Sequence, residues 1–288
     1  MRRLTGIAEW RPASTTWEAV AQLARLGRMD IVHAHMTAAE AAAVITKPRH
    51  RARLATTLHF ASTPRSRAIR APLRHLGRQM DEQIAISEFV ASAVPATRVL
   101  PNGVESADPG PSKRECSVLV MQRLESEKQT EVALRAWSQC QLRGNGWRLV
   151  VAGRGAEEAN LHRLSAELGI AGSVDWAGFV DDPDRLLSRV GMLLAPAPAE
   201  PFGLAVVEAM ARATPVVAAD GGAHGETVGP DGWLFAAGDA NACARLLDDV
   251  QNRDLASYGD SLRARQRQLF DIETHVDGLL RVYRELIG

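Results

Sequence analysis

The stretch MLLAPAPAEPFGLAVVEAMARATPVVAA, residues 192–219, decides the predicted fold class. It begins with a short apolar run at 192–195, which is the length of a buried strand. A proline-rich loop follows, then a helix-like segment at 202–213, and then a second apolar run at 215–219. Two short apolar runs joined through a helix are typical of a β-α-β unit, in which the two strands are parallel.

The same alternation extends in both directions along the chain. Helix-like segments separate the apolar runs, and two more helical segments follow at 255–269 and 272–287. The pattern predicts an α/β fold with parallel sheets covered by helices on both faces. The expected strands are 30–35, 54–59, 83–86, 98–100, 117–121, 148–152, 174–177, 192–195 and 215–219, and the expected helices before 255 are 15–27, 37–46, 65–79, 127–142, 157–169, 184–190, 202–213 and 240–252.

The chain has 288 residues, which is enough for two domains. Residues 101–113 are rich in proline and glycine and predict a linker. Charge also changes sign there, because 1–112 hold 15 Lys and Arg against 9 Asp and Glu, whereas the remainder holds 19 against 25. We expect a first domain at 1–108, a second at 109–270, and a carboxy-terminal helix at 271–288 that can pack back on the first domain.

Composition excludes several classes of protein. No run of 18 or more apolar residues is present, and the amino terminus shows no secretion signal. The three cysteines are too few and too far apart for a disulfide framework or a zinc site, so a reduced cytoplasmic protein is expected. Aromatic residues make up only 5% and do not interleave with the basic residues, which argues against nucleic-acid binding.

Glu208 is the only charged residue between 202 and 211. A carboxylate on so apolar a helix is costly to bury without a partner. The amino end of this helix, at Gly203 and Leu204, would supply unpaired amides and partial positive charge for an anion. Eight helical residues rise about 12 Å, which matches the span from a sugar across a pyrophosphate to a ribose. Glu208 could then accept hydrogen bonds from ribose hydroxyls and Glu200 from sugar hydroxyls; alternatively, Glu208 pairs with a core arginine and Glu200 faces water.

The pair Glu200 and Glu208 resembles the Glu-x7-Glu motif of the retaining glycosyltransferases of family four, which have the GT-B fold. Other stretches resemble blocks of that family in the same order, and the match runs from about residue 29 to 240. These stretches are DIVHAH (30–35), TLH (57–59), AISE (85–88), LPNGV (100–104), VVAGRG (150–155), VDWAGFV (174–180) and PVVAADGG (215–222).

The resemblance implies two Rossmann-like doubly wound domains, of which the first is shortened because the family's earliest strands and glycine-rich loop have no counterpart. It also implies transfer from a nucleoside-diphosphate sugar with retention of configuration, no metal ion and no cofactor. The first domain would bind the acceptor and the second the donor. The alternative is a non-catalytic, nucleotide-sugar-binding or scaffolding remnant. A GT-B epimerase is disfavoured by the paired glutamates.

Arg123 and Lys128 follow the strand at 117–121, and a basic strand-to-helix turn suits a diphosphate. They could instead pair with neighbouring acidic residues at 125, 127 and 131. By resemblance they match the family's phosphate-binding Arg and Lys, and Val180 matches a position whose backbone reads the base. Gln122 and Gln129 stand where the family usually has glycine, so that close backbone approach to the donor is reduced.

His59 closes the expected strand at 54–59, at the end where open α/β sheets bind ligands. The resemblance implies that it contacts the donor sugar near the reacting carbon. His33 and His35 are expected to pack at the end of their strand, with a role in the acceptor cleft as the alternative. Gly153-Arg154-Gly155 could begin a dinucleotide fingerprint, but Glu158 occupies the third glycine position, which disfavours a nicotinamide enzyme.

Residues 41–80 hold nine Lys and Arg and no acidic residue. Within them, 63–80 carry an apolar stripe flanked by arginines. This segment predicts either a sheet-covering helix with a solvated basic face or peripheral contact with an anionic acceptor or the inner membrane surface. Loss of the earliest strands would also expose a sheet edge that a homodimer could cover.

Overall fold

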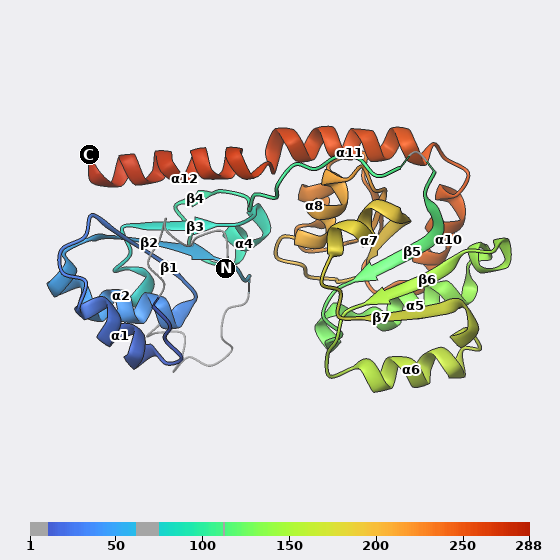
Figure 1. Ribbon diagram of the computed structural model, residues 1–288, viewed down its shortest axis with the longest axis horizontal. Coiled ribbons are helices and arrows are strands. Elements are labelled where there is room, and N and C mark those ends of the chain that lie inside the picture. Colours follow the sequence, from blue (N-terminus) through green and yellow to red (C-terminus); the bar gives the residue numbers. More distant parts are fainter. Residues whose placement is uncertain (1–10, 62–74, 112) are drawn as a thin grey trace. The chain divides into compact units, whose positions relative to one another are not determined.

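The computed structural model describes residues 11–61, 75–111 and 113–288 (Figure 1). The chain divides into two compact units, the first comprising 1–100 with 277–288 and the second comprising 101–276. The helix α12 (Ile272–Ile287) therefore begins in the second unit and ends in the first. The second unit begins with the first residue of the expected linker.

The first unit contains a four-stranded parallel sheet in the order β1-β2-β3-β4. Its register pairs Ile31 with Arg53 and Ala55 with Glu82. Val32, Ala43, Ala52, Leu54 and Met80 form its apolar core. Its elements are α1 (Thr16–Ala24), β1 (Ile31–His35), α2 (Thr37–His50), β2 (Arg53–Leu58), β3 (Glu82–Ala85), α4 (Glu88–Ala93) and β4 (Arg98–Val99).

The second unit contains a six-stranded parallel sheet in the order β10-β9-β8-β5-β6-β7. The order of the chain through the sheet reverses between β5 and β8, which makes this the switch point where open α/β sheets bind ligands. Its elements are β5 (Glu115–Met121), α5 (Thr130–Gln139), β6 (Arg148–Ala152), α6 (Glu158–Glu167), β7 (Val174–Gly178), α7 (Pro183–Arg189), β8 (Val190–Ala195), α8 (Leu204–Ala211), β9 (Val216–Asp220), α9 (His224–Val228), β10 (Trp233–Ala236), α10 (Ala240–Val250) and α11 (Leu255–Leu269), with short 3₁₀ turns at 126–128, 141–145 and 171–173.

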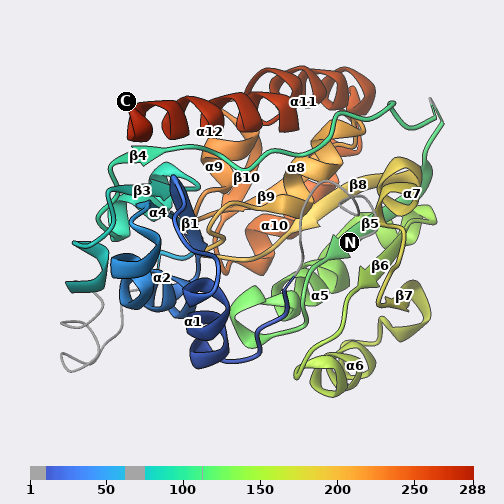
Figure 2. The same cartoon turned by 60° about the vertical axis from the view of Figure 1, so that its left-hand side comes forward.

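The central strands of this sheet, β5, β8 and β9, are buried on both faces over most of their length, as the continuous apolar runs predicted, whereas the edge strand β7 is largely exposed. Val118 and Val120 of β5 lie in one cluster with Leu149, Met192, Leu194 and Val217 of neighbouring strands and with residues of α5, α6 and α10. The alternate residues point to the other face, where α8 packs against β8 and β9. Figure 1 shows α5 and α8 on opposite sides of the sheet, and Figure 2 shows the same two layers after rotation.

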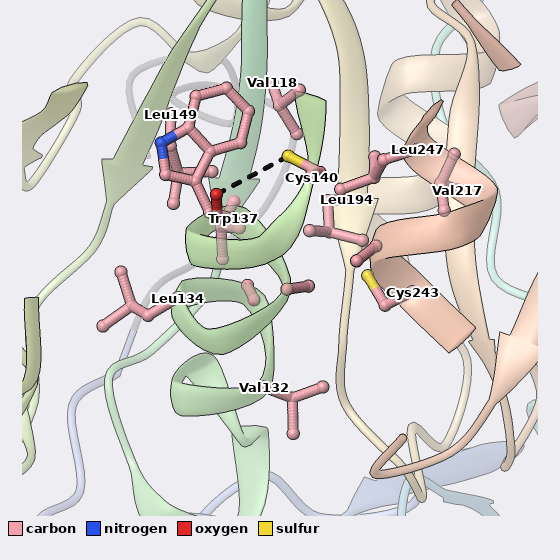
Figure 3. Packing of buried hydrophobic residues seen from close by; sticks show 14 of the residues in the cluster. Val118, Val132, Leu134, Trp137, Cys140, Leu149, Leu194, Val217, Cys243 and Leu247 are labelled. Atoms are coloured by element: carbon pink, nitrogen blue, oxygen red, sulfur yellow. Dashed lines mark hydrogen bonds between the residues drawn. The ribbon is translucent and has the colours of Figure 1, made fainter. Parts of the chain in front are cut away.

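Trp137 is fully buried at the centre of the larger cluster (Figure 3). Its indole nitrogen donates to Ser173 Oγ over 3.0 Å, and the Cys140 thiol donates to its carbonyl oxygen over 3.6 Å. Burial raises the pKa of Cys140 to about 11 and also raises the pKa of Cys243, so both side chains remain thiols at neutral pH. None of the three cysteines forms a disulfide.

The predicted α/β class with two parallel sheets is confirmed, and all nine expected strands are present with bounds that differ by at most two residues. The sequence did not predict β10, α4 or α9. The helices α2 and α5 differ in length from the expected 37–46 and 127–142. Most of the expected helix at 65–79 lies outside the described residues.

Candidate active site

The carboxyl ends of the second unit's strands carry the predicted donor-binding residues. All strands of this sheet are parallel, so the loops after β5, β7 and β8 emerge at one edge. Arg123 and Lys128 follow β5, Val180 follows β7, and Glu200 and Gly203 follow β8. The fold therefore gathers residues that are up to 80 positions apart in the sequence.

Lys128 and Glu200 form an ion pair across the switch point. Lys128 Nζ lies 2.5 Å from Glu200 Oε2, and the two side chains are only 16% and 19% exposed. An ion pair with this little solvent is screened weakly, so loss of either partner leaves a costly lone charge. Two residues predicted to bind neighbouring parts of one donor thus lie together, and each neutralises the charge of the other.

The Glu200 loop rests on the backbone that follows β9. The amide of Ala223 donates to the Glu200 carbonyl over 2.8 Å. A Cβ on Gly222, whose φ is +60°, would lie 2.3 Å from that same carbonyl oxygen. Only glycine allows the backbone to approach so closely, which explains why glycine stands at position 222.

His224 is a buried neighbour of this loop that the sequence did not identify. Its Nδ1 lies 3.1 Å from the Ala219 carbonyl, which requires Nδ1 to carry the proton and leaves Nε2 as an acceptor. Burial is the main cause that lowers its pKa, so the ring is neutral at pH 7. The only local signal for His224 would have been its position after the two glycines at 221 and 222.

The helix α8 begins at Leu204 with Gly203 as its amino-terminal cap. Gly203 has φ of +87°, and its carbonyl accepts from the amides of Val206 and Val207. The segment before Leu204 is a loop, so the expected rise of about 12 Å from Glu200 to Glu208 was wrong. Only the four steps from Leu204 to Glu208 are helical, and they rise about 6 Å.

Glu208 is half-buried and makes no hydrogen bond or ion pair with any residue that the structure describes. The alternative that it pairs with a core arginine is therefore not observed. Arg212, one turn further along, pairs instead with Asp184 of α7. Burial raises the pKa of Glu208, Asp184 raises it further and Arg212 lowers it. This carboxylate is available to accept hydrogen bonds from a ligand.

Arg123 adopts the alternative partner that its neighbours suggested. Its guanidinium donates to Glu127 over 2.9 Å, and both side chains are more than half exposed. Exposed pairs of this kind contribute little to stability and exchange readily. Arg123 is thus placed at the right edge of the sheet but does not join Lys128 and Glu200. Val180 is half-buried beside Phe179, whose side chain is 67% exposed.

Gln122 and Gln129 lie on either side of the Lys128 turn, and only the first stabilises it. The Gln122 amide donates to the Lys128 carbonyl and to Thr130 Oγ1, each over 2.9 Å. Gln129 has a left-handed backbone with φ of +48°, and its Oε1 is buried without a hydrogen bond from the described residues. The Gln122 side chain therefore contributes two hydrogen bonds to this turn, whereas Gln129 has a strained backbone.

We expect Gln129→Gly to raise the free energy of unfolding by about 1–4 kcal/mol. Relief of the left-handed backbone contributes about 1–2 kcal/mol, removal of the orphan oxygen about 1–3, and the entropy of glycine in the unfolded chain offsets about 0.5–1 of this gain. For a domain of this size, each 1 kcal/mol raises the melting temperature by about 2–4 °C, which circular dichroism can measure.

Gln129→Ala is the matched control because it removes the oxygen but keeps the strained backbone. Its melting temperature should lie between those of the parent and the glycine variant. A glycine variant that melts below the parent would contradict this account of the turn.

His59 lies just beyond β2 in the first unit, where His35 contacts it. His35 Nδ1 and His59 Nε2 are 2.9 Å apart, so one ring must donate and the other accept. Burial and then His35 lower the pKa of His59, which keeps it neutral at pH 7. Its proposed contact with a donor sugar stays a prediction.

His33 and His35 are the two histidines for which packing at the strand end was expected. His33 is half-buried and contacts Tyr283 of α12 over 2.5 Å and Thr57 over 2.8 Å. His35 is exposed and stacks on His33 with 4.7 Å between ring centroids. Both rings therefore pack at the end of β1, His33 against Tyr283 and the more exposed His35 against His33 and His59.

Residues 63–74 of the basic 63–80 segment lie outside the described residues. Within the described parts of the chain, no helix combines the length and apolarity needed to cross a bilayer. The same parts contain no group of three or more histidine, cysteine or acidic side chains placed to hold a metal ion.

Two family models match the chain. The model described as glycosyl transferases group 1 matches residues 104–267, which is more than half of the chain. The model described as glycosyltransferase family 4 matches residues 3–108. Together they cover nearly the whole sequence.

Curated relatives agree with these models. The lipopolysaccharide core biosynthesis mannosyltransferase LpcC of Rhizobium leguminosarum bv. viciae is 30% identical over 305 aligned residues, covering 97% of this chain and 84% of that protein. A D-inositol 3-phosphate glycosyltransferase of Acidothermus cellulolyticus is 33% identical, covering 66% of this chain and 48% of that protein.

Solved structures show the same architecture. Anabaena Alr3699/HepE in complex with UDP superposes with a TM-score of 0.83 at 22% identity, covering 94% of this chain and 82% of that one. Sucrose-phosphate synthase from Thermosynechococcus elongatus also gives a TM-score of 0.83, at 21% identity, covering 98% and 81%. With the family models and the relatives, these likenesses show that the chain belongs to the group 1 glycosyltransferases and has the GT-B fold.

Proposed function

We propose that this glycosyltransferase moves a sugar from a nucleoside-diphosphate sugar to an acceptor hydroxyl, with retention of configuration and without a metal ion. One observation carries the proposal. Lys128 and the amino end of α8 follow the two strands at the switch point of the second unit's sheet, and Glu208, one turn further along α8, has no hydrogen bond or ion pair among the described residues. That set supplies positive charge for a diphosphate and an acceptor for ribose hydroxyls.

The donor would lie along α8 in this proposal. Glu208 accepts hydrogen bonds from the ribose hydroxyls, and the amides at Gly203 and Leu204 face the diphosphate. Lys128 leaves Glu200 and turns to the diphosphate, where its ammonium stabilises the charge that develops as the sugar departs. Glu200, released in the same exchange, accepts from the sugar hydroxyls. Arg123 can add a second positive group after it leaves Glu127.

The acceptor would bind to the first unit. His59 contributes there to holding the reacting sugar, and its neutral ring can accept or donate a hydrogen bond. The basic 63–80 segment supports an anionic acceptor or peripheral contact with a membrane surface. LpcC is named for lipopolysaccharide core biosynthesis, which is consistent with an acceptor of that anionic, membrane-derived kind.

Calorimetric titration of the purified chain with UDP, GDP, ADP and TDP tests the donor site. We expect one of the four to bind in the presence of EDTA, with an affinity that added Mg²⁺ does not change. Glu208→Gln should weaken that binding about tenfold to a hundredfold, because hydrogen bonds to a charged group contribute about 1.5–3 kcal/mol.

Glu167→Gln is the control, since it removes an exposed carboxylate from α6 that lies in no predicted site. A folded Glu208→Gln variant that binds as tightly as the parent would exclude the ribose role. Binding without turnover of any donor sugar would instead favour the non-catalytic alternative. The anomeric configuration of a product, read by NMR, decides retention.

A further inference from the structure

Arg212 forms an ion pair with Asp184, although another carboxylate, Glu208, precedes it by four positions in the sequence. Its side chain is only 10% exposed, and its Nη2 contacts Asp184 Oδ2 in the first turn of α7. Asp184 itself is 60% exposed and makes no other hydrogen bond or ion pair within the described part of the chain. This ion pair joins α7 to the carboxyl end of α8.

Glu208 of α8 lies four positions before Arg212, the residue that caps the carboxyl end of this helix, so the two are about one turn apart. Side chains at this spacing are neighbours, and an acidic residue preceding a basic one is the favourable order for an ion pair. Glu208 nevertheless has no partner among the described residues. The spacing makes Arg212 the expected partner of Glu208, but Arg212 pairs with Asp184 instead.

We propose that Asp184 is a positioning residue for donor binding, which holds Arg212 away from Glu208 and so keeps the Glu208 carboxylate open to the ribose hydroxyls. This inference rests on the proposed function, in which Glu208 binds the ribose. Without Asp184, the buried guanidinium would be left with an uncompensated charge and would turn to Glu208. The donor would then have to break that pair before it could bind.

The net charge of the site alone predicts the opposite change in nucleotide affinity when Asp184 is removed, so a binding measurement distinguishes the two explanations. Asp184 adds negative charge to a unit that binds a diphosphate, so its removal alone should tighten binding. The positioning role requires weaker binding instead. Within the described part of the chain, the charged groups that shift the pKa of Glu208 are Asp184 and Arg212, so the proposed competition involves these three side chains.

The experiment titrates UDP, GDP, ADP and TDP into Asp184→Asn, Arg212→Gln and the double variant. Asp184→Asn should bind the preferred nucleotide about tenfold more weakly, the typical cost of displacing a partly buried ion pair. The double variant should recover the affinity of Arg212→Gln, because no guanidinium remains to occupy Glu208. Asp184→Glu, which keeps the charge, should bind as the parent does.

Unchanged or tighter binding in a folded Asp184→Asn variant overturns the inference. So does weak binding that persists in the double variant, because it would mean that Asp184 meets the nucleotide itself. If Asp184→Asn does not fold, the inference is decided by Asp184→Glu, whose loss of affinity would overturn it. If Glu208→Gln leaves nucleotide affinity unchanged, the proposed donor site is wrong. If Glu208→Gln weakens nucleotide binding and Asp184→Asn does not, only the role of Asp184 is wrong.

Discussion

Lys128→Met is expected to lower kcat/KM for sugar transfer about a thousandfold, which corresponds to about 4 kcal/mol. Two losses coincide in this variant. The diphosphate loses the ammonium that balances its charge as the sugar departs. Glu200, only 19% exposed, also loses its partner and leaves a lone carboxylate beside the incoming donor. Initial rates with the donor nucleotide found by titration measure the effect.

Lys113→Met is the matched control, because it removes an exposed lysine from the same unit. Glu200→Gln provides the sharper comparison. It retains Lys128 and releases its ammonium, so nucleoside diphosphate binding should be preserved or tightened while turnover falls. If Glu200→Gln abolished diphosphate binding, the Lys128–Glu200 ion pair would have only a structural role. The proposed exchange of Lys128 from Glu200 to the diphosphate would then be wrong.

The location of the proposed donor-binding residues could be predicted from the sequence because it follows from parallel strands alone. Once the apolar runs are assigned as strands of one parallel sheet, Lys128, Val180 and Glu200 must emerge at the same edge. The Lys128–Glu200 contact could not be predicted, since 72 positions separate the two residues and no local pattern relates them. The same holds for the ion pair between Arg212 and Asp184, which are 28 positions apart in the sequence.

The fold was predictable where apolar periodicity is long and failed where elements are short. The strand β10 has only four residues, and α9 has five, so neither gives a periodic signal above its surroundings. The helix α8 begins two residues later than expected because Gly203 adopts φ of +87° and ends the loop there. That small shift changed the inferred distance between the two glutamates.

Gly153→Ala is expected to lower the free energy of unfolding by about 3 kcal/mol or more and the melting temperature by about 6–12 °C. Gly153 has φ of +138°, which side chains rarely adopt, and a Cβ there would lie 1.9 Å from the Gln122 carbonyl oxygen. Backbone must therefore move on one side or the other. Thermal unfolding followed by circular dichroism measures the loss.

The displacement would also reach the donor site, because Gly153 lies between the ends of β5 and β7. The backbone N–H of Gly153 donates to the Gly178 carbonyl over 2.7 Å, and the backbone N–H of Gln122 donates to the Ala152 carbonyl over 3.1 Å. Movement of Gln122 shifts Arg123, and movement of Gly178 shifts Val180, so nucleotide binding should fall even well below the melting temperature. Gly144→Ala is the control, since its Cβ would meet open space and its backbone is ordinary. Equal melting temperatures for the two alanine variants would show that the close approach of Gly153 to the Gln122 carbonyl does not constrain the fold.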